Sequence, residues 1–436
     1  MSRFESAAWL FYQSAFAAVL PLSMPLLAAR RGLGHYRATW RGRLGRVLPS
    51  PPVVPGALWA HAVSVGEVGV AATLLRRLPA QLPLCVTTVT PTGQAQAQRL
   101  FAGRAAVGYL PFDLGFAVNR FFAAVAPRLL LLSEGDYWPL VLREARRRRV
   151  PVVVVNGRLS DRAFARQRRL GAINRLFYDP VDLFAMQTAD DRDRLVALGV
   201  DPAKVVVAGN IKFDALPPPP KPELEAALLK LAGGRPILVA GSTLEGEEAA
   251  LLDACAQLGR GRLLLLLAPR HPERWESVEK LIRGRGFTLR RRSDGLAAAG
   301  DGAAPEVVLL DSLGELAALY RLGTVAFVGG TLVAKGGHNP IEPAHFGCPI
   351  LVGPSMFNFR DIGQRFTEAA AWRQLERPDQ LTTALRELLE RPDQAAALGA
   401  RARALLEKNG GAVARTYDLI RPYIDQAFGK EAEPPA

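Results

Sequence analysis

The chain has 436 residues, of which 49% are hydrophobic and 22% are charged, and its formal net charge is +14. This length favours two or three folded domains, and the hydrophobic share excludes an intrinsically disordered chain. The positive charge attracts anions, and composition alone leaves nucleic acid, anionic lipid and a phosphorylated substrate open.

Residues 1–48 combine an apolar stretch with a basic cluster. The segment 7–29 has no charged residue, and as a helix it would be roughly 35 Å long, enough to cross a bilayer. Its prolines and polar residues equally allow a kinked helix that lies in the membrane plane. The basic cluster that follows predicts a cytoplasmic location for the rest of the chain. We therefore expect a membrane-associated segment over 1–48, with a buried amino-terminal hairpin as the alternative.

A first domain is predicted over 49–214, after a proline-rich joint at its start. Short apolar runs such as "ALWAHAV", "LCVTTVT", "RLLLLSE" and "PVVVVNG" alternate there with helical patterns. Continuous hydrophobicity is typical of parallel strands that are buried on both faces. The pattern therefore predicts an α/β domain with a doubly wound parallel sheet.

A second domain of the same kind is predicted over 223–410. The stretch "ALPPPPKP" at 215–222 cannot continue a helix or a central strand, which indicates a stiff linker. The alternating pattern then restarts with "PILVAGS", "RLLLLLAP" and "TVAFVGG". The last segment, 411–436, begins with a helix that we expect to pack back on the first domain. Two such domains would face each other across a cleft and bind ligands at the carboxyl ends of their strands.

The residues just after the predicted strands form the candidate site. In the first domain, "SVGE" places Glu67 one residue after Gly66, at a predicted helix start. Gly66 is expected to let the chain turn without a Cβ clash, and the helix dipole is expected to keep the pKa of Glu67 low. Such a carboxylate either stabilises its helix or acts as a base, and the polar residues at the neighbouring strand ends favour the base.

The second domain carries the matching signals for an anionic ligand. In "GGHNPIEP", Asn339 suits the N-cap of a helix and Glu342 its first turn. Free backbone N–H groups there, with Gly336 and Gly337 allowing close approach, would bind a phosphate. Glu342 would either accept hydrogen bonds from ribose hydroxyls or only cap its helix. Arg270, after the most hydrophobic strand, is expected to hold an anion.

Several patterns exclude other chemistry. No P-loop and no Gly-x-Gly-x-x-Gly turn follows a strand, which disfavours ATP hydrolysis and dinucleotide redox chemistry. "DDRD" at 190–193 is interpreted as an exposed helix start, and "RRRR" at 146–149 as a solvated helix end that could touch lipid headgroups. Cys85, Cys255 and Cys348 lie in apolar contexts without paired spacing, which indicates neither disulfides nor a zinc site.

Together these stretches resemble the 3-deoxy-D-manno-octulosonic acid (Kdo) transferases of lipopolysaccharide biosynthesis. The motifs that carry the resemblance are "AHAVSVGEV", "TTVTPTG", "LPFD", "EGDYWP", "NGRLSDR", "GNIKFD", "AGSTLEGEE", "APRHPER", "DSLGEL" and "GGHNPIEPAHFGCPILVGP". The resemblance is collinear over nearly the whole chain. It implies a GT-B fold of two Rossmann-like domains, held at the cytoplasmic face of the inner membrane by the amino-terminal segment.

The resemblance also implies an activity. Members transfer Kdo from CMP-Kdo to a lipid A precursor with inversion of the anomeric configuration, and without a metal or another cofactor. The implied partners are therefore CMP-Kdo, the lipid A precursor and the anionic inner-membrane surface, and nucleic acid is not among them.

Roles for individual residues follow from the same resemblance. Glu67 would be the general base, and Glu134 would be a second catalytic carboxylate near the acceptor. The acceptor side would also include Thr92, Asp136 and Arg158. The donor site would include Lys212, Ser242, Arg270, Gly330, Gly337, Asn339 and Glu342.

One stretch departs from the family pattern, and two alternative functions stay open. The family usually has Glu-Thr-Glu before its Trp-Pro motif, whereas this chain has "EGDYWP" at 134–139. The second acid, Asp136, is one methylene shorter, so the acceptor or the number of sugars added could differ. One alternative is another GT-B nucleotide-sugar enzyme, either a transferase with a different donor or an epimerase, and an epimerase would need no apolar amino-terminal segment. A non-catalytic membrane-bound scaffold would not need Glu67, Arg270 and Glu342 together.

Overall fold

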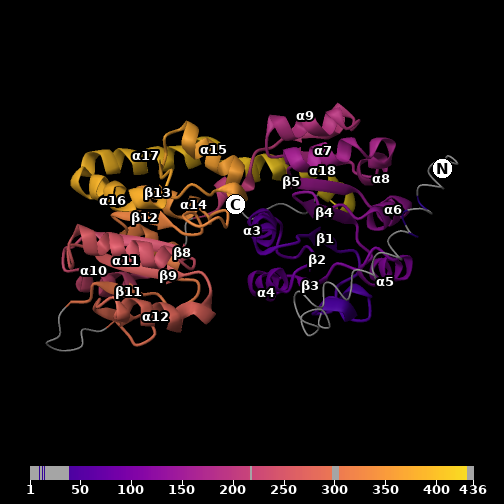
Figure 1. The fold of residues 1–436 in the computed structure, drawn as a ribbon. Coiled ribbons are helices and arrows are strands. Elements are labelled where there is room, and N and C mark those ends of the chain that lie inside the picture. Colours follow the sequence, from indigo (N-terminus) through magenta and orange to yellow (C-terminus); the bar gives the residue numbers. More distant parts are fainter. Residues whose placement is uncertain are drawn as a thin grey trace. The chain divides into compact units, whose positions relative to one another are not determined.

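The computed structural model describes residues 39–216, 219–296 and 304–429, together with Trp9, Tyr12 and Ser14. The chain divides into two compact units. Unit 1 comprises Met1–Ala215 and Gly410–Ala436, and unit 2 comprises Leu216–Asn409. Each unit contains one seven-stranded sheet with helices on both of its faces (Figure 1). The predicted fold class, α/β with two doubly wound parallel sheets, is confirmed.

The sheet of unit 1 has the strand order β3-β2-β1-β4-β5-β6-β7, and all neighbouring strands are parallel. Its strands are β1 (Leu58–His61), β2 (Leu84–Thr88), β3 (Ala106–Tyr109), β4 (Leu129–Ser133), β5 (Val152–Gly157), β6 (Leu183–Met186) and β7 (Val205–Val207). The α-helices that follow β1 in this unit are α3 (Val65–Leu75), α4 (Pro91–Leu100), α5 (Gly115–Val125), α6 (Pro139–Arg147), α7 (Asp161–Arg168), α8 (Arg175–Tyr178), α9 (Ala189–Ala197) and α18 (Ala412–Phe428).

Each strand of unit 1 contributes to two cores because alternate side chains point to opposite faces of the sheet. On one face, Leu58 and Ala60 of β1 pack with α3 and with α18. On the other face, Trp59 is fully buried against Phe121 and Phe122 of α5. This burial on both faces explains why the strands are continuously apolar in the sequence.

Unit 2 repeats this architecture with the strand order β10-β11-β9-β8-β12-β13-β14. Its strands are β8 (Ile237–Thr243), β9 (Leu264–Pro269), β10 (Leu289–Arg291), β11 (Val307–Leu309), β12 (Val325–Val328), β13 (Ile350–Val352) and β14 (Arg373–Gln374). Its α-helices are α10 (Pro222–Ala232), α11 (Glu247–Leu258), α12 (Trp275–Gly284), α13 (Leu316–Leu319), α14 (Ile341–Ala344), α15 (Arg360–Glu368), α16 (Leu381–Glu390) and α17 (Pro392–Asn409). Helices α11, α12, α16 and α17 cover one face and α10 covers the other.

Most of the predicted apolar segment 7–29 lies outside the described residues. Of those that are described, Trp9 is 8% exposed and belongs to a core of unit 1, where the guanidinium of Arg143 lies 4.7 Å from its ring centroid. The Tyr12 hydroxyl donates a 2.6 Å hydrogen bond to Asp113. No helix in the described part of the chain combines the length and the hydropathy needed to cross a bilayer.

Two helix ends that the sequence assigned to solvent are partly paired or buried. In the first turn of α9, Asp191 is buried and accepts a hydrogen bond from the Leu159 N–H at 2.8 Å, so the helix start at 190–193 is not simply exposed. At the end of α6, Arg147 and Arg148 both form ion pairs with Glu144.

Candidate active site

The strand orders of the two sheets locate the candidate ligand sites. In a doubly wound sheet, ligands bind outside the carboxyl ends of the strands where the chain reverses its winding direction. In unit 1 this point lies between β1 and β4, and in unit 2 it lies between β8 and β12. Glu67 follows β1, Glu134 and Asp136 follow β4, and Ser242 and Gly330 lie at the ends of β8 and β12.

Glu67 lies in the first turn of α3, and its carboxylate folds back onto the start of that helix. Oε2 accepts a hydrogen bond from the Val63 N–H at 2.9 Å, and Oε1 accepts one from Ser64 Oγ at 3.1 Å. Burial nevertheless raises the pKa of Glu67, and the charge of Glu134 acts in the same direction, whereas the two hydrogen bonds and His61 act against it. The prediction of a low pKa is therefore wrong, because burial outweighs the helix start. A raised pKa makes the carboxylate a better proton acceptor.

Gly66 does not serve the purpose that the sequence suggested. It lies inside α3 without a positive φ, and a Cβ at this position would meet no atom within 4 Å. The turn from β1 into α3 therefore does not require glycine. The missing side chain instead leaves open space beside Glu67.

Glu134 is held in a left-handed backbone conformation by β5 and by two cations. Its φ is 62°, its N–H donates to the Val155 carbonyl, and its own carbonyl accepts from the Arg158 N–H. Oε1 lies 2.8 Å from Lys212 Nζ, Oε2 lies 2.7 Å from Arg158 Nε, and the side chain is 7% exposed. Such a conformation persists where neighbours over-determine it. Lys212, which the sequence assigned to the donor site, and Arg158, assigned to the acceptor side, are thus both paired with Glu134 in unit 1.

Asp136 lies two residues further along and is held through one oxygen only. Oδ2 accepts hydrogen bonds from His61 Nε2 at 3.2 Å and from Trp138 Nε1 at 2.7 Å. Burial favours the neutral acid, but the hydrogen bonds from His61 and Trp138 and the charge of Arg43 together lower the pKa of Asp136. Asp136 is therefore an ionised carboxylate at neutral pH.

His61 connects this carboxylate to the sheet, and the sequence did not single it out. It is the last residue of β1 and is buried, and its Nδ1 lies 3.1 Å from the carbonyl and 3.0 Å from Oγ1 of Thr87. Thr87 Oγ1 also accepts a hydrogen bond from Trp59 Nε1 at 2.8 Å. The available signal was a histidine at the end of an otherwise apolar strand, directly before "SVGE".

Arg43, which the sequence counted only in the amino-terminal basic cluster, also reaches this site. Its guanidinium carbon lies 4.2 Å from the ring centroid of Phe112 and 5.5 Å from that of Trp138. Burial lowers the pKa of Arg43 to about 10, while the charge of Asp136 acts in the opposite direction. The side chain therefore stays cationic at neutral pH beside Asp136.

Thr92 is exposed and lies in the first turn of α4. Its hydroxyl makes only a long 3.5 Å contact with Thr90 Oγ1, which is at the limit of a hydrogen bond. Thr90 caps the helix by accepting from the Gly93 N–H at 3.0 Å and donates to the Val63 carbonyl at 3.2 Å. Val63 is also the residue whose N–H holds Glu67, so the start of α4 is tied to the start of α3.

Three of the predicted donor residues come together in unit 2. Arg270 follows β9 and is exposed, and its guanidinium forms no hydrogen bond or salt bridge with the described residues. Its charge opposes the burial that raises the pKa of Glu342. Asn339 Nδ2 donates to Glu342 Oε1 at 3.3 Å. An unpaired cation beside a carboxylate and an amide can bind a ligand that carries both an anionic group and hydroxyls.

His338 adds to this cluster a buried polar atom whose hydrogen-bonding capacity is not satisfied by the described residues. Burial, then the charges of Arg270 and His271, lower its pKa to about 4. The ring is therefore neutral at pH 7, and its buried Nε2 has no hydrogen-bond partner among the described residues.

The glycine-rich loop does not offer the free N–H groups that the sequence suggested. The N–H groups of Gly336, Gly337 and His338 donate to Ser355 Oγ, the Gly330 carbonyl and the Gly329 carbonyl respectively. A Cβ at Gly337 would lie 2.4 Å from Met356 Sδ, and one at Gly336 would lie 2.6 Å from Asn358 and Phe357. These glycines therefore allow the segment 355–358 to pack closely.

The helix start after this loop is also different from the prediction. Helix α14 has only four residues, its N-cap position is Pro340, and the Asn339 side chain accepts from the Ile341 N–H at 3.1 Å. A single turn provides only a small dipole. Any anion binding in this region therefore depends on side chains such as Arg270.

Ser242 and Gly330 are positioned by the sheet and by a buried acid that sequence reasoning missed. Ser242 has a φ of 55° and lies at an irregularity in the pairing of β8 with β9. The N–H of Gly330 donates to Glu247 at 2.7 Å, and Glu247 also accepts from the N–H groups of Leu244, Thr331 and Leu332 at 2.9 Å. Glu247 is fully buried, so it fixes the loop after β12.

A second buried acid, Glu248, was also missed. It pairs with Arg274 through contacts of 2.6 and 3.2 Å and accepts from Thr243 Oγ1 at 3.0 Å. The guanidinium of Arg274 is therefore paired with an acid of the protein, whereas that of Arg270 has no such partner among the described residues. In the sequence, the acidic run "LEGEE" was the only indication of these two buried acids.

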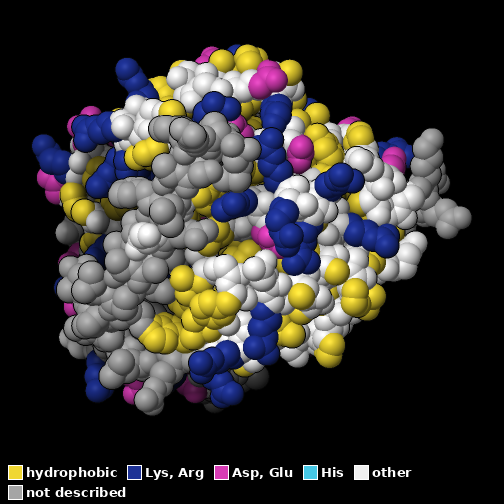
Figure 2. Space-filling view, turned by 90° about the vertical axis from the view of Figure 1, so that its right-hand side faces the viewer, with side chains coloured by type: hydrophobic (Ala, Val, Ile, Leu, Met, Phe, Trp, Pro, Cys, Tyr) yellow, Lys and Arg dark blue, Asp and Glu magenta, His cyan; other side chains and the backbone are white. Residues whose placement is uncertain are grey.

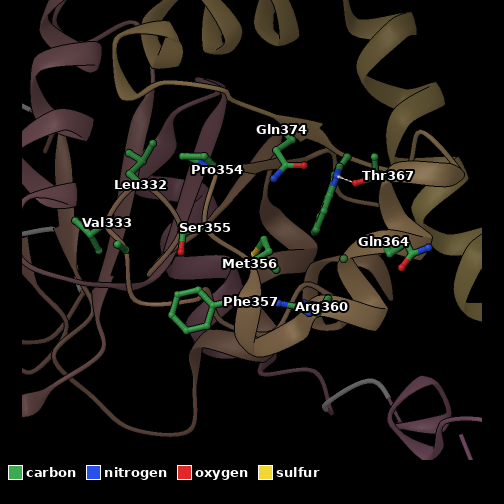
Figure 3. Close-up of a pocket in the computed structure, with 13 residues that line it drawn as sticks. Leu332, Val333, Pro354, Ser355, Met356, Phe357, Arg360, Gln364, Thr367 and Gln374 are labelled. Atoms are coloured by element: carbon green, nitrogen blue, oxygen red, sulfur yellow. Dashed lines mark hydrogen bonds between the residues drawn. The ribbon is translucent and has the colours of Figure 1, made fainter. Parts of the chain in front are cut away.

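A pocket of about 540 Å³ lies at the carboxyl ends of β12 and β13 in unit 2. Figure 3 shows Leu332 and Val333 from the glycine-rich loop on one side and Phe357 and Arg360 on another. Trp372 Nε1 donates to Thr367 Oγ1 at 3.2 Å within it. None of the predicted donor residues lines this pocket.

A protein metal site needs several His, Cys, Asp or Glu side chains close together. Within 39–216, 219–296 and 304–429, no group of three or more His, Cys, Asp or Glu side chains could hold a metal ion. The three cysteines are buried and free.

Comparison with known proteins identifies the family. A family model described as "3-Deoxy-D-manno-octulosonic-acid transferase (kdotransferase)" matches residues 38–215. The 3-deoxy-D-manno-octulosonic acid transferase of Haemophilus influenzae is 33% identical over 433 residues, covering 96% of this chain and 99% of that protein. The chain belongs to this family. The Bordetella pertussis member is 35% identical over 413 residues, covering 91% of this chain and 94% of that protein.

As a Kdo transferase, the protein is a glycosyltransferase, and its fold agrees with this class. The crystal structure of UDP-GlcNAc 2-epimerase from Neisseria meningitidis, bound to UDP-GlcNAc, matches with a TM-score of 0.55 at 12% identity. The match covers 85% of this chain and all of the epimerase. This likeness supports the GT-B type of fold and nothing about the substrate.

Proposed function

We propose that this Kdo transferase moves Kdo from CMP-Kdo to a lipid A precursor, with inversion at the anomeric carbon and without a metal ion. The observation that carries the proposal is the state of Glu67, a carboxylate with a raised pKa held at the winding reversal of unit 1. The family membership supports Kdo as the transferred sugar.

In the proposed reaction, Glu67 acts as the general base. It removes the proton from the acceptor hydroxyl while the hydroxyl oxygen forms a bond to the anomeric carbon of Kdo. The bond from that carbon to the phosphate oxygen breaks, its electron pair leaves with CMP, and the proton stays on Glu67. Attack from the face opposite CMP inverts the configuration. Removal of a proton by a positioned base contributes typically 100-fold or more.

The donor is proposed to bind to unit 2 through Arg270, Asn339 and Glu342. CMP-Kdo carries a sugar carboxylate and a phosphodiester, so its binding needs cations, and the unpaired guanidinium of Arg270 supplies one. Glu342, held by Asn339, would accept hydrogen bonds from hydroxyls of the donor. The other proposed donor residues, Ser242, Gly330 and Gly337, would shape the backbone of the same region.

Lys212 is proposed to act with Glu134 near the acceptor, because these two residues form an ion pair of 2.8 Å. Thr92 and Arg158 would complete the acceptor side. In this proposal, these side chains supply the acids and cations for both substrates, and no further cofactor takes part.

The protein is proposed to work at the anionic cytoplasmic face of the inner membrane. Helix α7 supports this because none of its residues is buried. Arg162, Arg166 and Arg169 have no hydrogen bond or salt bridge from their guanidinium groups to the described residues. Leu170 and Ile173, which follow, are each 37% exposed. Figure 2, which faces the side of unit 1 where α6 and α8 lie, shows many Lys and Arg side chains and few acids.

The test is incubation of the protein with CMP-Kdo and a tetra-acylated lipid A precursor, with the products weighed by mass spectrometry. We expect a mass increase of one or more Kdo residues, with unchanged yield after dialysis against EDTA. No transfer to the lipid, or transfer that stops with EDTA, would contradict the proposal.

The base assignment is tested by Glu67→Gln, which keeps the size of the side chain but removes its basicity. We expect the transfer rate to fall by about 100-fold or more, with CMP binding in a direct titration unchanged. Asp193→Asn, at an exposed acid of α9, is the control and should keep the normal rate. A Glu67→Gln rate above about a tenth of normal would show that Glu67 is not the base.

A further inference from the structure

The two oxygens of Asp136 have different surroundings. Oδ2 accepts from both His61 Nε2 and Trp138 Nε1, whereas Oδ1 has no hydrogen-bond partner among the described residues. The side chain is 35% exposed. One oxygen is therefore fixed by the protein and the other is available to a ligand.

Glu134, two residues earlier, has no such free oxygen. Lys212 and Arg158 occupy its two oxygens separately, and the side chain is 7% exposed. A ligand would have to displace a cation to reach this carboxylate. Of the two acids in "EGDYWP", Asp136 is thus the one that a neutral polar ligand can reach directly.

The groups around His61 allow its Nε2 to donate a hydrogen bond to Asp136 whether the ring is neutral or protonated. Trp59 Nε1 donates to Thr87 Oγ1, so the hydroxyl hydrogen of Thr87 is free to be donated to Nδ1 of a neutral imidazole. In an imidazolium, Nδ1–H instead donates to the Thr87 carbonyl. In both cases Nε2 carries a hydrogen and donates it to Asp136.

The same histidine lies close to the proposed base. Its charge acts on Glu67, and β1, which ends in His61, pairs with β4, which leads to Asp136. Glu67 and Asp136 therefore both interact with one buried ring. A hydroxyl that Asp136 binds would belong to the same sugar from which Glu67 removes a proton.

We propose that Asp136 binds a hydroxyl group of the acceptor sugar through Oδ1, and that His61 is the positioning residue that fixes Asp136 through Oδ2. This inference rests on the proposed function. A hydroxyl is the matching group because it donates a hydrogen bond to an ionised oxygen, whereas an anionic group of the acceptor would be repelled. Charge-assisted bonds of this type are among the stronger hydrogen bonds in proteins.

The sharpest test is Asp136→Asn, with transfer measured at saturating CMP-Kdo and varied lipid acceptor. His61 and Trp138 both donate, so they hold the amide oxygen and turn the NH2 group to the Oδ1 position. The site then presents a donor where it had an acceptor, at nearly unchanged size. We expect the KM for the acceptor to rise roughly 10- to 100-fold, with the KM for CMP-Kdo within about twofold of normal.

His61 is tested by a pair of variants. His61→Ala removes the donor to Asp136 and should raise the acceptor KM in the same way, whereas His61→Gln, whose amide N–H can replace Nε2–H, should restore at least part of the acceptor affinity. A merely structural histidine would instead change kcat, the KM for CMP-Kdo and the melting temperature, with no specific effect on the acceptor. Asp193→Ala is the control for loss of an exposed acid.

The outcomes separate this inference from the proposed function. If the wild-type protein transfers Kdo to the lipid but Asp136→Asn leaves the acceptor KM unchanged, Asp136 does not bind the acceptor. If His61→Gln and His61→Ala are equally impaired in acceptor KM, the donated hydrogen bond is not what positions Asp136. If the wild-type protein itself transfers no Kdo to the lipid, the proposed function fails before this inference is tested.

Discussion

At the scale of single residues, Glu67 shows how burial and hydrogen bonding compete over one carboxylate. The N–H of Val63 and the hydroxyl of Ser64 stabilise its ionised form, yet burial is the larger effect and its pKa is raised. A base needs to be ionised before it can accept a proton. The transfer rate should therefore fall on the acid side at a higher pH than an exposed glutamate would require.

Ser64→Ala tests this balance because the Ser64 hydroxyl lowers the pKa of Glu67. Without that hydrogen bond the ionised form is less stable, so the pKa rises further and the acid limb of the kcat/KM profile should move to higher pH. The rate on the alkaline plateau should change little, since Ser64 makes no side-chain cap hydrogen bond to α3. The measurement is a pH–rate profile at limiting acceptor concentration.

A limb that does not move, or that moves to lower pH, would contradict the assignment of the titration to Glu67. Asp113 is the alternative source of such a limb, because burial raises its pKa to about 6. Asp113 is held by Tyr12 and by the N–H groups of Leu140 and Val141. If Asp113 caused the acid limb of the kcat/KM profile, that limb would lie at the same pH in the wild-type protein and in Ser64→Ala.

The sequence identified the carboxylates near the site, but it did not show whether they are ionised or which residues pair with them. Glu67, Glu134 and Asp136 follow recognisable strands, so their positions at one sheet edge could be predicted. Their protonation and pairing depend on residues that are distant in the sequence: Lys212 is 78 positions from Glu134, and His61 is 75 positions from Asp136. No local pattern encodes such pairs, and for this reason His61 was missed.

At the scale of elements, the loop from β12 to α14 depends on glycine for packing. Gly337 has a φ of 73°, and a Cβ there would lie 2.4 Å from Met356 Sδ. The sequence correctly indicated that glycine allows close approach at this position, but the partner is the protein itself. The difference arises because the path of the segment 353–359 could not be known from the loop alone.

Gly337→Ala should therefore destabilise unit 2. The left-handed conformation alone costs an alanine about 1–2 kcal/mol, and the contact with Met356 adds to this cost. Gly69→Ala is the matched control, because Gly69 lies inside α3 and its Cβ would meet no atom within 4 Å. That variant should be neutral or stabilising by up to about 1 kcal/mol. Thermal unfolding of both variants checks the prediction, and equal melting temperatures would contradict it.

Helix α7 is the element that we propose to contact the anionic membrane surface. None of its residues is buried, and only Ala163 and Phe164 pack against the core of unit 1. Replacing Arg162, Arg166 and Arg169 together by Gln should weaken binding to anionic vesicles by about 1 kcal/mol per arginine, which is roughly 100-fold in total. Cosedimentation with vesicles that contain an anionic lipid measures this effect.

The control for α7 removes the same charge elsewhere. Arg386, Arg391 and Arg403 are exposed residues on or next to α16 and α17 of unit 2, and their replacement by Gln lowers the net charge equally. If this control variant loses as much vesicle affinity as the α7 variant, binding depends on net charge alone. The α7 surface would then have no special role.

At the scale of the whole molecule, the fold class was predictable because it depends on a repeated pattern. The strands Leu129–Ser133 and Val152–Gly157, which begin with four consecutive Leu or Val residues, are buried along their whole length, as parallel strands between two helical layers must be. The buried acids that hold the loops of unit 2 could not be predicted from the sequence. Glu247 and Glu248 are charged residues that are fully buried, and burial of such residues is exceptional unless the fold pairs them.

The proposed membrane attachment is a prediction about the whole chain. Two parts of the sequence can contribute, and they differ in physical character. Residues 7–29 carry no charge, so their contribution would be apolar and insensitive to salt. The contribution of the α7 arginines would be electrostatic, and it would weaken as the screening length falls from about 10 Å at 0.1 M salt to 3 Å at 1 M.

Deletion of residues 1–30 should therefore change the salt dependence of membrane binding. The chain without the deletion should float with anionic vesicles both at about 0.1 M salt, where screening is weak, and at about 1 M salt, where screening is strong. The deletion variant should be released at the higher salt, and the deletion combined with the three α7 substitutions should be released at both. Circular dichroism checks that each variant is folded, since Trp9 and Tyr12 pack on unit 1. A deletion variant that floats at high salt would require another apolar contact with the membrane, because electrostatic attraction by α7 cannot persist under that screening.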